Sequence, residues 1–399
     1  MTDSDWYNEH RDPEAWALDL GIAPPPARLD LAWPQVSADI GLPGGRLEGF
    51  ATSLFVQARH SEARDTARLI EHTGVGAVFT LDHRRAKLTP LQRALRAVDL
   101  TRGRHVGADM LVDYGAYAGP KRKVASDGLS RQWVQDQHIH MRLPWALTDS
   151  GFCDTLQDVQ RTLQDARKFH ERVIVALPMP HALLRDSPDV LLDLINGQAH
   201  PVALMLEHET DPFEVAGVVE GLIDIVTQSA PGAMLLRSDT SALGAISHGA
   251  LAGAVGTHSG LRHIYPRRNG GGRSEQLAFV VPALLSYYSQ VRFEQAYFRD
   301  PTLATWRCGC WFCTGRDLSW IAGQPEDLLF RSAFQHSVAA VAAIGSQLVS
   351  TSALDNAAAW ATLCQHAQRQ HSLLSNPGGS AWQPKRALEH WGRLVPTRR

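Results

Sequence analysis

Residues 201–239 read PVALMLEHETDPFEVAGVVEGLIDIVTQSAPGAMLLRSD. Two short apolar runs, 201–209 and 233–239, flank a stretch with helical periodicity, 212–230. Apolar strands that alternate with helices are typical of a parallel sheet covered on both faces. This segment therefore predicts a strand–helix–strand unit, and the number of such units along the chain decides the fold class.

The same alternation extends in both directions from this segment. Eight candidate strands lie at 51–57, 76–83, 108–115, 137–144, 172–178, 201–209, 233–239 and 252–260. Amphipathic stretches such as 61–73 and 153–171 lie between them. Eight units in roughly 250 residues favour a closed (β/α)8 TIM barrel over an open sheet. The apolar stretch 326–348 is expected to be the helix that closes the barrel, and 354–371 a further helix.

The predicted organisation has four parts. Residues 1–45, which contain Pro24-Pro25-Pro26, form an N-terminal surface extension. The barrel covers 46–300, an inserted zinc-binding subdomain with the closing helix covers 301–350, and a helical, basic tail covers 351–399.

Composition narrows the class of protein. The 399 residues, 44% hydrophobic and 20% charged, suffice for one large core or two medium ones. No uninterrupted apolar run reaches the roughly 18–20 residues of a membrane helix, so no membrane partner is expected. The N-terminal MTDSDWYNEHRDPE is acidic and polar, unlike a secretory signal or a transit peptide. Clustering of three of the five cysteines indicates metal binding in a reducing environment, which predicts a cytoplasmic protein. The formal net charge of −2 means that a polyanion would have to be held by a local basic patch.

Three of the five cysteines are crowded into residues 308–313, which read CGCWFC. A tight turn can direct three thiolates at one ion, and Zn²⁺ favours four soft ligands in a tetrahedron. His336, on the predicted closing helix, is the best candidate for the fourth ligand. The expected structural zinc site thus consists of Cys308, Cys310, Cys313 and His336. Cys153 and Cys364 are predicted to be plain buried thiols.

A Cys-x-Cys-x-x-Cys run followed by a late-helix histidine after a (β/α)8 barrel resembles the tRNA-guanine transglycosylase superfamily. That superfamily inserts 7-deazaguanine bases into tRNA, and relatives do so in DNA. The family's His-Asn pair reads His336-Ser337 here. The family's strand three ends in a run like Thr-Asp-Ser-Gly-Gly-Phe, and Val112–Tyr117, VDYGAY, occupies that place. The resemblance covers roughly residues 46–350 and has strong motifs only at its two ends.

Active sites of such barrels lie at the C-terminal ends of the strands. Those ends carry Asp82, Asp113, Glu207, Glu209, Asp239 and His258. Base exchange at a nucleoside C1′ needs one carboxylate that attacks the sugar and a second group that moves the proton of the base. The resemblance implies that Asp113 handles this proton, although Asp-Tyr-Gly is also a turn sequence. The family's nucleophile lies on the last strand, where GAVGTHSG at 253–260 holds no acid, so Asp239 is the candidate replacement; a turn or cap aspartate would look identical.

Recognition of the base also departs from the family. The family uses an aspartate at the end of strand four, and the predicted strand here ends in Leu143-Pro144-Trp145. Strand-end aromatic and polar side chains can take over stacking and hydrogen bonding to a small 7-deazaguanine-type base. The candidates for this role are Tyr114, Tyr117, Trp145, Glu207, Glu209 and His258.

The densest basic stretch, residues 258–273, combines four arginines with a glycine hinge. Arginine forks suit phosphate oxygens, and glycines let a loop follow a nucleic-acid backbone. The expected nucleic-acid contacts are Arg262, Arg267, Arg268 and Arg273, with Lys121-Arg122-Lys123 as an extension. Whether the polymer is tRNA or DNA stays open, as does a homodimer or a partner subunit.

Two other readings compete with base exchange. A metal-dependent hydrolase is suggested by His138-Ile-His140, but such enzymes carry the His-x-His motif on their first strand. A non-catalytic zinc-containing barrel subunit, which binds nucleic acid or a partner in a modification complex, is favoured by the missing acid on the last strand.

Overall fold

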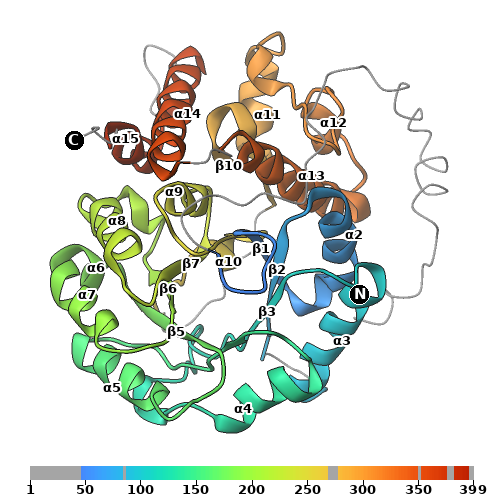
Figure 1. Cartoon of the computed structure of the whole chain (residues 1–399). Helices are drawn as coiled ribbons and strands as arrows, with labels where there is room; N and C mark the ends of the chain where they lie inside the picture. Colours follow the sequence, from blue (N-terminus) through green and yellow to red (C-terminus); the bar gives the residue numbers. More distant parts are fainter. Residues whose placement is uncertain (1–45, 84–86, 268–276, 349–351, 375–381, 395–399) are drawn as a thin grey trace. The chain divides into compact units, whose positions relative to one another are not determined.

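The computed structural model describes residues 46–83, 87–267, 277–348, 352–374 and 382–394 (Figure 1). The predicted N-terminal extension, 1–45, lies outside the described residues.

Eight parallel strands form the predicted (β/α)8 barrel. They are β1 (Leu54–Arg59), β2 (Gly76–Thr80), β3 (Met110–Asp113), β4 (Ala146–Leu147), β5 (Val173–Pro180), β6 (Val202–Glu207), β7 (Ala233–Ser238) and β8 (Gly253–Gly256). Hydrogen bonds join them in the order β3-β2-β1-β8-β7-β6-β5-β4. Because β1 pairs with both β2 and β8, the first and last strands lie side by side, as a barrel requires.

The barrel is nearly closed, with its seam between β3 and β4. Within the described chain no ladder joins these two strands, which stand at the ends of the order. The seam is bridged beyond the strands, where the Phe152 N–H donates to Lys123 O at 2.8 Å and the Ala125 N–H donates to Phe152 O at 3.1 Å. A Cβ on Gly151 would come within 2.1 Å of Val124 O, so only glycine allows this close approach.

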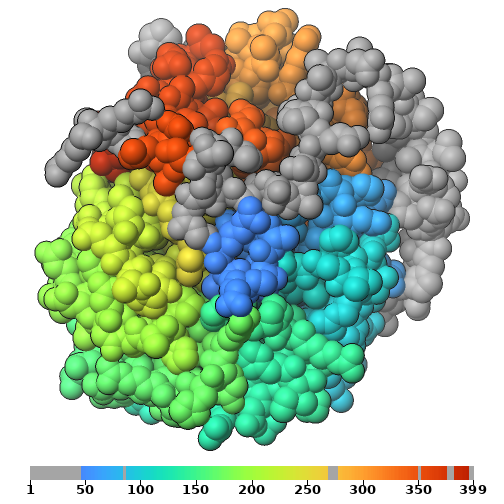
Figure 2. All heavy atoms as spheres, viewed as in Figure 1, coloured from blue at the N-terminus to red at the C-terminus, as the bar shows by residue number. Residues whose placement is uncertain are grey.

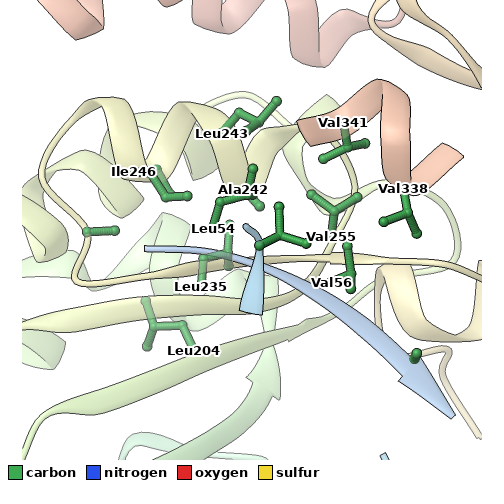
Figure 3. Packing of buried hydrophobic residues seen from close by; sticks show 14 of the residues in the cluster. Leu54, Val56, Leu204, Leu235, Ala242, Leu243, Ile246, Val255, Val338 and Val341 are labelled. Carbon is green, nitrogen blue, oxygen red and sulfur yellow. The ribbon is translucent and has the colours of Figure 1, made fainter. Parts of the chain in front are cut away.

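Helices surround the strands (Figure 1). They are α2 (Ala63–Thr73), α3 (Pro90–Arg104), α4 (Arg131–Gln135), α5 (Leu156–Ala166), α6 (His181–Asp186), α7 (Pro188–Asn196), α8 (Val218–Gln228) and α9 (Ser241–Ser247). The short α10 (Ser259–Arg262) contacts β7 and β8. The predicted closing helix is α13 (Glu326–Gly345), which packs on β1 and α2. Figure 3 shows Val338 and Val341 of α13 with Leu243 of α9 against strand residues such as Leu54 and Val255.

The prediction of strand four at 137–144 was wrong. Ser130 accepts a hydrogen bond from the Trp133 N–H and starts α4, which runs on into a π-helical turn, Asp136–His140. The real β4 is only two residues long and begins after Trp145. The alternation in QHIHMRLP imitates a strand, but the side-chain amide of Gln137 caps the main chain of Leu147, with Nε2 2.9 Å from Leu147 O. His138 and His140 thus lie on a helical turn that precedes β4, which removes the strand-borne His-x-His motif of the hydrolase reading.

Alternate strand residues fill the barrel with apolar side chains. The interior includes Phe55, Val78, Leu111, Leu147, Ile174, Ala203, Met205, Met234, Leu236 and Ala254. Leu47 and Phe50, which precede β1, join the same cluster. The barrel is therefore a packed core, and polar chemistry is expected at the last residues of the strands and in the segments that follow them.

The chain after β8 forms a hairpin and a group of helices. The hairpin strands are β9 (Ala278–Val281) and β10 (Ser286–Ser289), and the helices are α11 (Gln290–Arg299), α12 (Ser319–Ala322), α13, α14 (Ala353–Leu374) and α15 (Arg386–Arg393). In the space-filling view these orange and red segments gather on one side of the barrel (Figure 2). Among the described residues one helix, Glu326–Leu348, is long and apolar enough to cross a membrane by composition, and 78% of its most apolar window is buried, as in the core helix of a folded domain.

Candidate functional site

The three cysteines and the histidine predicted to bind metal come together. Their ligand atoms all lie within 4.8 Å of one another, and all four residues are buried. The Sγ atoms of Cys313 and Cys310 lie 3.1 and 3.7 Å from His336 Nδ1. In the described part of the chain this is the one group of three or more such side chains, and its soft donors could bind a metal ion.

The hairpin orients the histidine of this cluster. The Nε2 atom of His336 lies 2.7 Å from Val280 O, which leaves Nδ1 directed at the sulfurs. The neighbouring Ser337 accepts a hydrogen bond from the Val280 N–H at 3.2 Å. His336 and Ser337 thus satisfy both main-chain polar groups of Val280 in β9. The contact of His336 Nε2 with Val280 O orients the ring of this candidate metal ligand.

Asp113 lies at the centre of a hydrogen-bond network at the C-terminal end of the strands, which we call the barrel mouth. Its Oδ2 accepts from Gln57 Nε2 at 3.1 Å, Thr80 Oγ1 at 3.0 Å and the Tyr117 hydroxyl at 2.7 Å. Its Oδ1 accepts from the Gly115 N–H at 2.9 Å. Asp113 is 1% exposed, so both oxygens are buried and occupied. Burial, with the charge of Asp113 adding to it, raises the pKa of Tyr117 well above its ordinary value.

Gly115 explains the Asp-x-Gly pattern. Its φ is +73°, and a Cβ there would approach Leu81 O to 2.7 Å. Glycine is therefore required both for the backbone conformation and for the close approach. The turn reading and the functional reading of Asp113 are compatible, because the same side chain caps the turn and reaches the network.

Arg237 enters this network through an irregularity in β7. Met234 and Leu236 point into the barrel, so a regular strand would turn Arg237 outward. The register between β7 and β8 shifts between Leu235 and Ser238, and Arg237 has φ +48°, which is unusual for a residue with a side chain. As a result its guanidinium lies 4.9 Å from the centre of the Tyr117 ring, and its Nε lies 3.9 Å from Asp113 Oδ2.

Asp239, the predicted replacement nucleophile, belongs to a second cluster. Its Oδ2 accepts from Lys385 Nζ at 3.2 Å, and its Oδ1 accepts from the Ser241 N–H at 3.1 Å. Asp211, which follows β6, lies against it. The Oδ2 of Asp211 is buried, and no donor among the described residues reaches it.

The pKa values of the two aspartates in this second cluster are shifted in opposite directions. Burial and the negative charge of Asp239 raise the pKa of Asp211 well above its usual range. Burial alone would raise the pKa of Asp239 too, but Lys385 and the Ser241 N–H lower it below its usual value. The two carboxyl groups therefore differ in their affinity for a proton: this environment favours the protonated form of Asp211 and the ionised form of Asp239.

A cavity of about 490 Å³ adjoins this cluster. Its walls include Tyr287, Tyr288, Glu214, Lys385 and Arg386. Lys385 therefore joins the cavity to Asp239.

The loop after β8 contributes two further polar groups near Asp239. Burial lowers the pKa of His263 to about 3. The guanidinium of Arg262 lies 3.9 Å from the centre of the Tyr287 ring, and its Nε is buried with no hydrogen-bond partner in the described chain.

Three other residues predicted to contact the substrate, Tyr114, Glu207 and His258, have partners outside the two clusters. Tyr114 packs between His83 and Trp133, with ring centres 4.7 and 4.9 Å away. Glu207 pairs with Arg122 beside the seam, and burial raises the pKa of Glu207. His258 contacts the carboxylate of Glu62.

The corrected strand four changes the comparison with the transglycosylase family. Trp145 precedes β4, so it lies at the opposite end of the barrel from the mouth, where its Nε1 donates to Glu48 O at 2.9 Å. The aspartate that does follow β4 is Asp149. It accepts from Lys123 Nζ at 2.6 Å and from the Ser130 N–H at 2.8 Å. An acid thus stands at the end of strand four after all, engaged in an ion pair.

Some of the basic residues predicted to contact nucleic acid instead form ion pairs within the protein. Arg122 is paired with Glu207 and with Asp154, and Lys123 with Asp149, so these side chains belong to the barrel seam. Arg267 is exposed and donates to Arg122 O at 3.0 Å. Arg268 and Arg273 lie outside the described residues.

Sequence reasoning missed Asp211, Lys385, Arg237 and Gln57. Asp211 precedes Pro212 in a turn-like Thr-Asp-Pro and reads as a helix cap, which it also is, since it accepts from the Phe213 N–H. Lys385 comes from the basic C-terminal segment, 146 positions after Asp239. No short stretch of sequence predicts a contact between residues so far apart.

No protein-family model matches this chain, and no curated protein matches it. The fold and the site define the class: a (β/α)8 barrel with a buried Cys3His cluster after its eighth strand. A function has to be argued from the two polar clusters and the cavity.

Proposed function

We propose that this chain is a transglycosylase that exchanges a guanine or 7-deazaguanine base in tRNA or DNA, with Asp239 as its nucleophile. The observation that carries the proposal is the pair of Asp239 and Asp211 at the C-terminal end of the barrel, whose pKa values are shifted in opposite directions. Paired carboxyl groups with separated pKa values supply both functions that displacement at a sugar carbon requires.

The pair supports a complete double displacement. The Asp239 carboxylate attacks C1′, the bond from C1′ to the base breaks, and Asp211 gives its proton to the departing base. The incoming base then attacks C1′, releases Asp239 and returns a proton to Asp211. Lys385, 3.2 Å from Asp239, holds the nucleophile ionised between turnovers.

Asp113, to which the resemblance assigns the proton, has a different environment. Its oxygens already accept four hydrogen bonds, from Gln57, Thr80, Tyr117 and Gly115. We therefore assign proton transfer to Asp211 and give Asp113 the task of holding Arg237 across the mouth.

The metal in this proposal is a structural Zn²⁺ ion. Three thiolates and one imidazole fill a tetrahedron and leave no open position for catalysis. The ion would tie the loop after α11 to α13, and hence to the barrel. The cluster also preserves the part of the family pattern with the most specific spacing.

The experiment is a trap for the covalent sugar intermediate. The chain is incubated with tRNA or with guanine-containing DNA and run on denaturing gels, while exchange of labelled guanine is measured in parallel. Wild type should give an adduct, Asp239→Asn none, and Asp211→Asn slower exchange. Asp186→Asn, an exposed aspartate outside the cluster, serves as the control. Melting curves of each variant exclude unfolding as the cause of a loss.

A binding subunit without catalysis is the second candidate. The saturated Asp113 and the absence of an acid on β8 favour it. In that case the wild type binds nucleic acid but gives neither adduct nor exchange with either polymer.

A further inference from the structure

The cavity beside Lys385 combines features that suit an anion. Arg292 of α11, Lys385 and Arg386 supply three cationic side chains, while Glu214 is the one carboxylate among the described residues of the wall. The Lys385 side chain is about a quarter exposed; its ammonium lies 3.2 Å from Asp239 Oδ2, and the residue forms part of the cavity wall.

The start of α15 adds main-chain donors to the same wall. Residues Gln383–Arg386 line the cavity, and Arg386 is the first residue of the helix. Lys385 precedes it, and no side chain caps the helix start. The first N–H groups of a helix have no intrahelical partner and favour a negative charge. This arrangement is the usual basis of phosphate binding at a helix start.

Size and wall chemistry narrow the ligand further. A volume of about 490 Å³ falls within the range of small-molecule sites and exceeds what a bare phosphate needs. Tyr287 and Tyr288 supply aromatic wall, and Glu214 supplies an acceptor for a hydroxyl or ring N–H. Such walls match a phosphorylated nucleoside better than an inorganic ion.

We infer that this cavity binds the phosphate group of a nucleotide, with Arg292, Arg386 and the start of α15 as its contacts. The inference rests on the proposed function in one respect, because it takes the nucleotide to be a guanosine-type unit. It extends that function: the phosphate anchors the nucleotide beside Lys385, next to the nucleophile. The same chemistry can come from a free nucleotide or from a nucleic-acid strand.

Calorimetric titration of the full chain tests the inference. The probes are guanosine 5′-monophosphate, guanosine, inorganic phosphate and a short single-stranded oligonucleotide. The variant Arg292→Gln/Arg386→Gln removes both arginines from the wall. Arg299→Gln/Arg393→Gln is its matched control, because it removes the same charge from the far ends of the same two helices.

The nucleotide or the oligonucleotide should bind, and the wall variant should weaken that binding by about tenfold per lost charged contact. The control should stay within about twofold, since distant exposed charges are screened by salt. Preference for the mononucleotide identifies a free ligand, whereas binding of the oligonucleotide alone identifies a strand. The inference is overturned if guanosine binds as well as its phosphate, if no probe binds, or if both double variants behave like wild type.

Failure here can be told apart from failure of the proposed function. Adduct formation that survives the wall variant, without any phosphate preference, removes the inference and keeps the function. Phosphate binding that depends on the wall, with no adduct in the wild type, does the reverse.

Discussion

The cysteine cluster and the barrel mouth are built from residues at very different distances along the chain. Three of the four metal-ligand candidates lie within residues 308–313, and the fourth is on the next long helix. The mouth network joins residues as distant as Gln57 and Arg237, whose hydrogen bond spans 180 positions. The first can be recognised from spacing, because one turn determines the geometry. The second depends on how four strands align.

The two regions also differ in what satisfies their buried polar atoms. In the mouth network both oxygens of Asp113 are satisfied within the protein, by hydrogen bonds from four neighbours. The cysteine cluster, by contrast, has few hydrogen-bond donors for its sulfur atoms. A bound cation would therefore stabilise the buried thiolates more than protein donors can. We therefore expect the cysteine cluster to contribute stability through the ion and the mouth to contribute it through hydrogen bonds.

The largest effect should follow loss of the metal. Cys310→Ser should abolish binding of about one zinc ion per chain and lower the free energy of unfolding by more than about 5 kcal/mol, because binding energy at a structural site is folding energy. Metal analysis and urea unfolding measure both. Cys153→Ser is the control: its Sγ lies 3.4 Å from Thr162 Oγ1, so a hydroxyl can replace it. A metal-free wild type with unchanged melting would contradict the metal centre.

The mouth network should give the next largest effect. Asp113→Asn places an amide where four donors converge, three of them on Oδ2, and it removes the charge facing Arg237. The expected loss is about 2–4 kcal/mol in urea unfolding, because buried donors are left unsatisfied. Asp186→Asn, on the surface, should change little. If Asp113→Asn is as stable as wild type, the carboxylate is not held by the network, and its role as proton carrier returns.

The cysteine cluster could be predicted from the sequence, whereas most of the mouth network could not. The barrel, the closing helix and the four metal-ligand candidates follow from periodicity and spacing, which are local. The segment 137–144 was misread because alternation over a few residues does not distinguish a strand from a capped helical turn. The orientation of Arg237 depends on an irregularity in β7. The partner of Asp239 is Lys385, a lysine from the C-terminal segment. Both are tertiary outcomes that no short window contains.

A pH series tests the cluster around Asp239. Burial lowers the pKa of His263 to about 3, whereas the unfolded chain titrates near 6.5. The unfolded state thus binds the extra proton between these values, so stability falls as the pH drops through that window. Relative to His263→Phe, wild type should lose about 2 kcal/mol between pH 8 and pH 5. Parallel stability curves for the two proteins would show that the folded state admits the charge.

The smallest predicted effect concerns Ser337, which supports the hairpin beside the cysteine cluster without belonging to the cluster. Ser337→Ala removes the acceptor of the buried Val280 N–H and should cost about 1 kcal/mol. Ser332 lies on the same helix, equally buried, with no hydrogen-bond partner for its hydroxyl among the described residues, so Ser332→Ala should be neutral or slightly stabilising. Metal content should be unchanged in both, because His336 keeps its own contact with Val280 O. Equal stability of the two variants, measured by urea unfolding, would mean that Ser337 does not support the hairpin. Metal loss in Ser337→Ala alone would instead show that Val280 must be held at both its polar groups before His336 can bind.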